Sequence, residues 1–178
     1  ERERKKKERE KERRKEGRKK EYDGKNQVIV VNEKSQFTKN ELSLENGNWE
    51  KYSDLDFLNR VGIAEAMLGK DLMPTEDRES ISSITPTGWK NKKIIFNGKE
   101  DYLYNRSHLI GFQLSGENAN AKNLFTGTRA LNANFEDEQS SMVYYENKIS
   151  NYIKNTNHHV RYRVTPIFRN VELVARGV

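Results

Sequence analysis

The spacing of apolar residues changes several times along the chain, and each spacing predicts a different element. Short β-branched runs, and stretches in which apolar and polar residues alternate, are typical of strands. Such patterns predict strands at residues 27–31, 92–96, 102–104, 159–168 and 171–175. Asn97 and Gly98 separate the second run from the third and predict a hairpin turn between them.

Helical spacing is clearest in the last third of the chain. Residues 140–153 place apolar side chains three or four positions apart and leave the other face polar, which predicts an amphipathic helix. Residues 37–42 predict a turn or a short helical piece, with Thr38 as its N-cap.

One stretch, residues 49–68, leaves its structure open. Leu55, Phe57 and Val61 suit a strand, whereas residues 64–68 suit a helix. Taken together, the predicted elements indicate an α+β domain built on an antiparallel sheet.

The charge of the chain is concentrated at its beginning. Residues 1–20 contain thirteen Lys or Arg, six Glu and no apolar residue, a net charge of +7, whereas the whole chain carries +6. We therefore expect residues 1–24 to be a solvated helix, a linker or a disordered extension, and residues 25–178 to form the folded domain. An electrostatic tether to DNA or to an anionic membrane is the alternative for this extension. Because the rest of the chain sums to about −1, a nucleic-acid surface there would have to be a local patch.

The absence of cysteine excludes disulfides, thiolate nucleophiles and cysteine-type zinc sites. No apolar run approaches the roughly 18 residues that cross a bilayer, and no signal-peptide core is visible. The first residue is Glu1, which leads us to expect a mature form or a fragment, and the predicted last strand so close to Val178 leads us to expect further chain beyond it.

Candidate chemistry gathers around one histidine. Residues 105–108 are polar and run directly into apolar residues, so we expect a strand that delivers His108 at its end. Hydrolysis of a phosphodiester needs a base, a cation on the phosphate and a stabilised leaving oxygen. His108 can serve as the base. Asn132 and Glu146 offer hard oxygen ligands for the cation, and Arg129 can bind the phosphate. The residues alone leave open a structural histidine and an asparagine-rich turn.

The order of motifs resembles the DNA/RNA nonspecific endonucleases, whose signature is Asp-Arg-Gly-His followed by Asn-Leu-(aliphatic or aromatic)-Thr and then Leu-Asn. Here the corresponding stretches are residues 105–108 and 123–132. Streptococcal extracellular or membrane-attached DNases of this kind are more narrowly similar over residues 49–56, 72–75 and 86–89. The similarity covers roughly residues 37–178.

The resemblance implies a ββα-metal core and gives a role to each matching position. His108 is expected to be the general base, Asn132 to bind Mg²⁺, and Glu146 to hold the water shell of the metal or to orient the site. Mn²⁺ is an expected substitute for Mg²⁺. Arg106 and Arg129 are expected to contact phosphate, and Asn123 to support the site.

Two departures from the family pattern affect these expectations. Asn105 and Ser107 stand where the signature has Asp and Gly, so one acidic partner of the site is missing. Asn132 and Glu146 are also fourteen residues apart, about 21 Å along one continuous helix, which is too far for one Mg²⁺. We therefore predict a break in the helix between residues 134 and 140.

The predicted function is a sequence-nonspecific endonuclease that cleaves DNA, with RNA left open, and leaves 5′-phosphate ends. The alternatives are a catalytically silent nucleic-acid-binding module, a sequence-specific nuclease and a nuclease toxin. The resemblance implies an extracellular or cell-surface bacterial enzyme, with a membrane anchor as one option and the oligomeric state open.

Three further patterns receive weaker interpretations. Adjacent His158 and His159 point to opposite faces of a strand, so a metal role is not favoured there. The pair Tyr144 and Tyr145 predicts helix packing rather than base stacking. Arg161 and Arg163 share one face of the strand at residues 159–168, which suits a DNA-facing patch and a solvated face equally.

Overall fold

The chain divides into two units in the computed structural model, Glu1–Phe37 and Thr38–Val178. The structure describes residues 3–4, 35–96, 98–134 and 137–178, so the predicted strand at residues 27–31 lies outside the described residues. The proposed boundary between an extension and a domain at residue 24 therefore stays a prediction. Among the described residues, no helix has the length and apolarity needed to cross a membrane.

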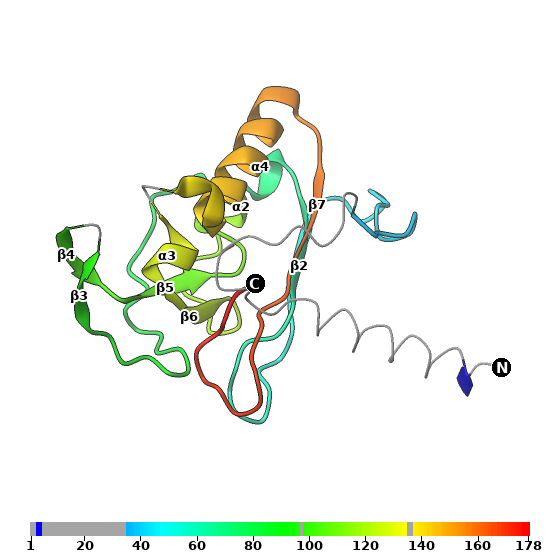
Figure 1. The fold of residues 1–178 in the computed structure, drawn as a ribbon. Coiled ribbons are helices and arrows are strands. Elements are labelled where there is room, and N and C mark those ends of the chain that lie inside the picture. The colour runs from blue at the N-terminus through cyan, green and yellow to red at the C-terminus, as the bar shows by residue number, and fades with distance from the viewer. Residues whose placement is uncertain (1–2, 5–34, 97, 135–136) are drawn as a thin grey trace. The chain divides into compact units, whose positions relative to one another are not determined.

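The second unit contains a three-stranded antiparallel sheet in the order β1–β2–β7 (Figure 1). Its strands are β1 Trp49–Tyr52, β2 Ala64–Leu68 and β7 Val160–Val164. Residues 64–68, whose structure the sequence leaves open, therefore form a strand and not the helix that their composition suits. These residues pair with β1 on one side and β7 on the other, and Ala64, Ala66 and Leu68 are fully buried. Pairing and burial on both sides outweigh the helical preference of an Ala-Glu-Ala-Met-Leu segment.

The connection between β1 and β2 also differs from the prediction. Leu55, Phe57 and Val61 lie in a loop rather than on a strand, and Phe57 is 88% exposed. Residues 37–42 form the predicted turn, in which Thr38 Oγ1 accepts from the Glu41 amide and the Glu41 carboxylate accepts from the Thr38 amide. This reciprocal pair is a capping box.

Two small antiparallel sheets complete the strands. One is the predicted hairpin, β3 Lys93–Phe96 with β4 Lys99–Tyr102, in which Gly98 takes a φ of 74°. The hairpin is confirmed, although its second strand begins at Lys99 and Asn97 lies outside the described residues. The other sheet pairs β5 Tyr104–His108 with β6 Leu124–Thr128.

The helices are short except for the last one. They are α2 Phe112–Ser115, α3 Arg129–Asn132 and α4 Met142–Thr156, with 3-10 turns at Lys70–Leu72 and Glu138–Ser140. The amphipathic helix predicted for residues 140–153 is confirmed as α4, which buries Met142, Glu146, Ser150 and Ile153. The predicted break is also confirmed, because α3 ends at Asn132 and α4 begins only at Met142.

The strand predicted for residues 171–175 is wrong. This segment is a series of turns with one isolated bridge, between Ile167 and Gly177. Its carbonyls bond to side chains instead of a strand, since Arg60 donates to the carbonyls of residues 170 and 172, and Thr87 donates to that of Leu173. No neighbouring strand is needed to satisfy these backbone groups.

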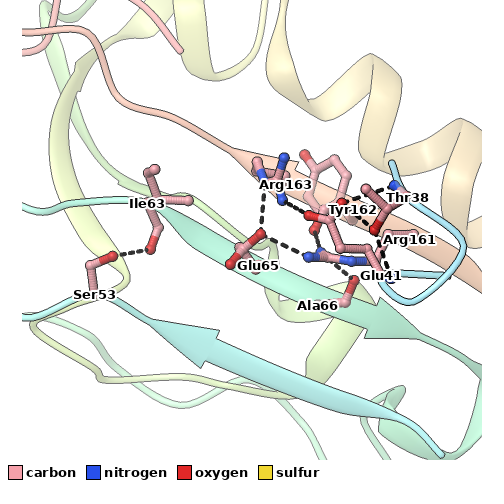
Figure 2. A network of polar contacts seen from close by, with 9 residues as sticks. All are labelled: Thr38, Glu41, Ser53, Ile63, Glu65, Ala66, Arg161, Tyr162 and Arg163. Carbon is pink, nitrogen blue, oxygen red and sulfur yellow. Dashed lines mark hydrogen bonds and ion pairs between the residues drawn. The ribbon is translucent and has the colours of Figure 1, made fainter. Parts of the chain in front are cut away.

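Arg161 and Arg163 share one face of β7, as predicted, but Arg161 does not face solvent. Both guanidinium groups pair with the Glu65 carboxylate, as Figure 2 shows. The nitrogen-to-oxygen distance is 2.7 Å for Arg161 and 2.6 Å for Arg163. The Arg161 side chain is 4% exposed and lies over the Trp49 ring, and Arg163 also pairs with Glu41. The DNA-facing patch is therefore wrong for Arg161, because burying this cation requires its partners.

Candidate active site

His108 lies at the last position of β5, as predicted, and is 6% exposed. Its Nε2 atom is 2.9 Å from the Asn118 carbonyl oxygen. A carbonyl oxygen only accepts, so Nε2 carries the proton and Nδ1 presents the free lone pair. Burial lowers the pKa of His108 below its ordinary value, the Asn118 hydrogen bond raises it, and the Arg78 charge lowers it further. The ring is therefore neutral near neutral pH and can accept a proton at Nδ1.

Asn123 holds the backbone that follows His108. Its fully buried side chain accepts from the Ile110 amide at 2.9 Å and donates to the Ile110 carbonyl at 3.0 Å. The Leu109 amide also donates to the Asn123 carbonyl at 2.9 Å. These three bonds hold the backbone of Leu109 and Ile110, the two residues that follow His108. The supporting role of Asn123 in the site stays a prediction.

Glu146 extends from α4 to the same part of the chain. Its carboxylate lies against the backbone of Gly111, where a Cβ atom would come within 2.3 Å of Oε2. Glu146 is 9% exposed, and burial raises its pKa to about 7 against the opposing effects of Gln113 and Arg78. The fold thus brings the Glu146 carboxylate against Gly111, which follows His108 by three residues.

The charge of Arg78 acts on both His108 and Glu146, although no motif in the sequence singles this residue out. Arg78 is exposed, and it lowers the pKa of His108 and the pKa of Glu146. Its guanidinium makes no hydrogen bond or ion pair with any residue that the structure describes. In sequence it stands among Glu76, Asp77 and Glu79, a pattern typical of a solvated loop.

Arg106 is engaged by a neighbouring loop. Its Nε donates to the Ile84 carbonyl at 2.7 Å, and one terminal nitrogen is 3.4 Å from the Ser82 carbonyl. Its guanidinium carbon lies 4.2 Å from the centre of the Trp89 ring. The predicted contact between Arg106 and phosphate stays a prediction.

Arg129 and Asn132 are the first and last residues of α3. Thr128 caps this helix by accepting from the Leu131 amide at 3.1 Å. Arg129 Nε lies 3.1 Å from Asp101 Oδ2, and its side chain is 20% exposed. Asn132 is partly buried at the end of the helix. Because α3 and α4 are separate helices in contact, the fourteen-residue spacing no longer excludes a shared cation.

The oxygen donors present fit a hydrated divalent cation. Within the described ranges no group of three or more His, Asp or Glu could hold a metal, which excludes a carboxylate cage there. Mg²⁺ usually keeps several waters and takes one or two protein ligands, such as an amide carbonyl and a carboxylate. The raised pKa of the buried Glu146 indicates a carboxylate whose charge a nearby cation would stabilise.

The adjacent His158 and His159 follow the C-terminal end of α4, just before β7. His158 is exposed and its Nδ1 lies 3.1 Å from the Tyr152 hydroxyl. Tyr144 and Tyr145 contact each other edge to face, with ring centres 5.3 Å apart, and Tyr145 is 43% exposed, so the packing interpretation stays a prediction.

The model of the DNA/RNA non-specific endonuclease family matches residues 38–178, and the chain belongs to this family. The predicted α+β class and ββα-metal core are confirmed by solved nucleases of the same fold. The chain is similar to the Sda1 nuclease, solved with a bound zinc ion, at 28% identity and a TM-score of 0.61. It is also similar in fold to NucA from Streptococcus agalactiae, solved with magnesium, at 22% identity and a TM-score of 0.64.

A third similar structure is an extracellular endonuclease, at 25% identity and a TM-score of 0.58. These matches cover 71%, 75% and 75% of this chain, and 66%, 64% and 61% of the respective solved chains. The chain thus spans less than two thirds of the length of each of these relatives. No curated protein matches it.

Proposed function

We propose that this protein is a metal-dependent endonuclease that hydrolyses DNA with little sequence preference. The observation that carries this proposal is the state of His108, a buried neutral imidazole whose Nδ1 is left free by the Asn118 carbonyl. An amide at Asn132 and a buried carboxylate at Glu146 accompany it, as the family pattern requires.

In the proposed reaction, His108 Nδ1 takes a proton from the attacking water. The water oxygen bonds to phosphorus, the bond from phosphorus to the 3′ oxygen breaks, and that oxygen is protonated, leaving 5′-phosphate and 3′-hydroxyl ends. Asn123 keeps the ring in place through the backbone. Arg129 and Arg78 supply positive charge to the non-bridging oxygens.

Asn132 would hold the cation, with Glu146 orienting its hydration shell. When bound, Mg²⁺ or Mn²⁺ supplies positive charge for the phosphate and lowers the pKa of nearby water. Magnesium in NucA and zinc in the Sda1 nuclease support a divalent cation as the cofactor. The sheet and helices that carry these residues all lie in Thr38–Val178. The division into a nuclease domain at residues 25–178 and an extension at residues 1–24 is part of the proposal.

DNA is the proposed substrate, and RNA is a second substrate to be tested beside it. The similar extracellular endonuclease and extracellular nuclease support a secreted or surface-attached enzyme. A silent DNA-binding module of the same fold is the rival function. The free Nδ1 of His108 favours the enzyme, because binding alone requires no such base.

The test is cleavage of supercoiled plasmid in Mg²⁺ by the purified chain and by His108→Ala, with EDTA as the metal control and the exposed His158→Ala as the matched variant. We expect nicking by the parent and by His158→Ala, and its loss in His108→Ala and in EDTA. A folded parent that binds DNA but leaves it intact in Mg²⁺ and Mn²⁺ would establish the binding module instead. Cleavage that survives His108→Ala would remove the proposed base.

A further inference from the structure

The β3–β4 hairpin stands out from the sheets and helices around it (Figure 1). Among the residues that the structure describes, its strands pair only with each other, in the register Lys93↔Tyr102 to Phe96↔Lys99. A two-stranded hairpin is marginally stable by itself in water. Its persistence here therefore depends on how its base is attached to the rest of the domain.

The base is held at three points, one of which is Arg129 of the proposed site. The Asn91 side chain accepts from the Tyr104 amide and donates to the Tyr104 carbonyl, both at 3.0 Å. The Leu103 amide donates to the Lys92 carbonyl at 2.8 Å. Asp101 pairs with Arg129, whose own amide donates to the Leu103 carbonyl at 2.9 Å. These bonds give a defined base to the segment that we call the arm, which comprises residues 90–96 and 98–103.

The arm presents unpaired positive charge. Its two acids are occupied, Glu100 by Lys93 at 2.7 Å and Asp101 by Arg129 at 3.1 Å. Three exposed lysines of the arm make no ion pair with any described residue; they are Lys90, Lys92 and Lys99. The surface charge left over is therefore entirely positive, although the domain outside the first twenty residues is nearly neutral.

One face of the arm also exposes large apolar side chains. Ile95 is 73% exposed and Tyr102 is 51% exposed. Lys93 lies directly opposite Tyr102, and Ile95 follows two positions along on the same face. Glu100 lies opposite Ile95 on this face, whereas the unpaired Lys99 lies opposite Phe96 on the other face. A nucleic-acid backbone is therefore favoured by the charge of the lysines, which suits phosphates, and not by the apolar face.

The arm continues directly into the strand that carries His108. His108 is six positions beyond Tyr102, so the two are at most about 20 Å apart at roughly 3.3 Å per residue. At about 3.4 Å per base pair, this distance corresponds to at most about six base pairs of duplex from the scissile phosphate. The pairing of Asp101 with Arg129 places the base of the arm beside the helix that carries Asn132.

We propose that the arm is a substrate-binding element that contacts the duplex several base pairs from the cleavage position through Lys90, Lys92 and Lys99. This inference rests on the proposed nuclease function and adds to it a dependence on substrate length. Contacts of this kind go to phosphates, so they raise affinity for any sequence and are sensitive to salt.

The experiment compares two triple variants of the whole chain. One replaces Lys90, Lys92 and Lys99 by Gln, and the control replaces the exposed Lys51, Lys70 and Lys154, which lie on other elements, by Gln. Binding of a 24-base-pair duplex is measured by anisotropy at several salt concentrations, with His108→Ala added to prevent cleavage. The ratio of kcat/KM for the long duplex to that for a dinucleotide is measured in the active chains.

We expect the arm variant to bind the duplex about tenfold more weakly and to lose up to about three from the slope of log K against log salt. We expect its long-to-dinucleotide ratio to fall about tenfold, while the control keeps the parent ratio. Equal effects of the two triple variants, or an unchanged ratio in the arm variant, would overturn the proposal. A parent that cleaves neither substrate would instead reject the nuclease function, because the binding comparison needs no cleavage.

A second copy of this chain is the rival occupant of the exposed face. Sedimentation of the parent and of Tyr102→Ser distinguishes the two. A dimer that Tyr102→Ser dissociates would overturn the assignment to nucleic acid, whereas a monomer in both cases agrees with it.

Discussion

A backbone carbonyl, rather than a carboxylate, holds the ring of His108. The site therefore lacks the negative partner that would raise the pKa of a catalytic histidine, and burial lowers that pKa instead. Arg78 strengthens this effect by adding positive charge. The consequence is a base that is neutral over a wider range of pH than an exposed histidine.

The first residue-scale prediction concerns pH. We expect kcat/KM to rise with pH through an apparent pKa below 6.5, because only neutral His108 accepts a proton. We expect Arg78→Ala to move this rise of kcat/KM, the acidic limb of the pH profile, to higher pH, because removing a cation makes protonation of the His108 ring easier. Titration of the His108 C2 proton by NMR gives the same shift without turnover. A limb that stays in place in Arg78→Ala would contradict the coupling.

The second residue-scale prediction separates two roles for Arg106. Its bonds to Ile84 and Ser82 hold the loop that follows Arg78, so Arg106 can act by placing Arg78 rather than by touching phosphate. We expect Arg78→Ala to lower kcat/KM on the order of a hundredfold. Arg106→Gln should cost about tenfold in the parent and less than about twofold in the Arg78→Ala background. Effects that multiply in the double variant would show that Arg106 binds phosphate independently.

At the scale of elements, close approach between Gly111 and α4 decides where Glu146 lies. A Cβ atom at residue 111 would come within 2.3 Å of Glu146 Oε2 and displace the carboxylate. We expect Gly111→Ala to lower activity more than about tenfold while the chain remains folded, as judged by circular dichroism. Gly177→Ala is the control, because a Cβ atom there meets nothing within 4 Å. Full activity of Gly111→Ala would argue against the role of Glu146.

The same scale shows what a single sequence can predict. The β3–β4 hairpin, the strand that ends at His108 and helix α4 follow from local spacing, and all three are present. Residues 64–68 do not, because their strand is dictated by β1 and β7, which are distant in sequence. The turns at residues 171–175 depend likewise on Arg60 and Thr87.

The candidate site shows a similar division. Its members came from a resemblance to a family motif and not from spacing, and their roles stay predictions. The hydrogen bonds between the Asn123 side chain and Ile110 join residues thirteen positions apart. Arg78 affects the pKa of Glu146 from a loop that contains no motif. Neither these hydrogen bonds nor the effect of Arg78 can be predicted from a local sequence pattern, because each depends on segments that meet only in the folded chain.

For the whole molecule, the buried Glu146 lowers the free energy of unfolding of the metal-free chain at neutral and alkaline pH. Its pKa is raised from 4.5 to about 7 in the folded chain, so the folded state binds an extra proton between these values. Stability from this group is therefore present below pH 4.5, falls as pH rises toward 7, and is constant above. The total loss is about 3 kcal/mol.

Replacing the carboxyl group of Glu146 by an amide should abolish this loss of stability at high pH. In EDTA at pH 8 we expect Glu146→Gln to raise Tm by roughly 5–10 °C, and to have little effect at pH 4.5. The exposed Glu45→Gln should change Tm at neither pH. A cation near Glu146 replaces the missing proton as its stabilising charge, so Mg²⁺ should raise the Tm of the parent at pH 8 more than that of Glu146→Gln. Equal stabilisation of the parent and of Glu146→Gln by Mg²⁺ would place the cation away from Glu146. The buried carboxylate would then lack the compensating charge proposed for it.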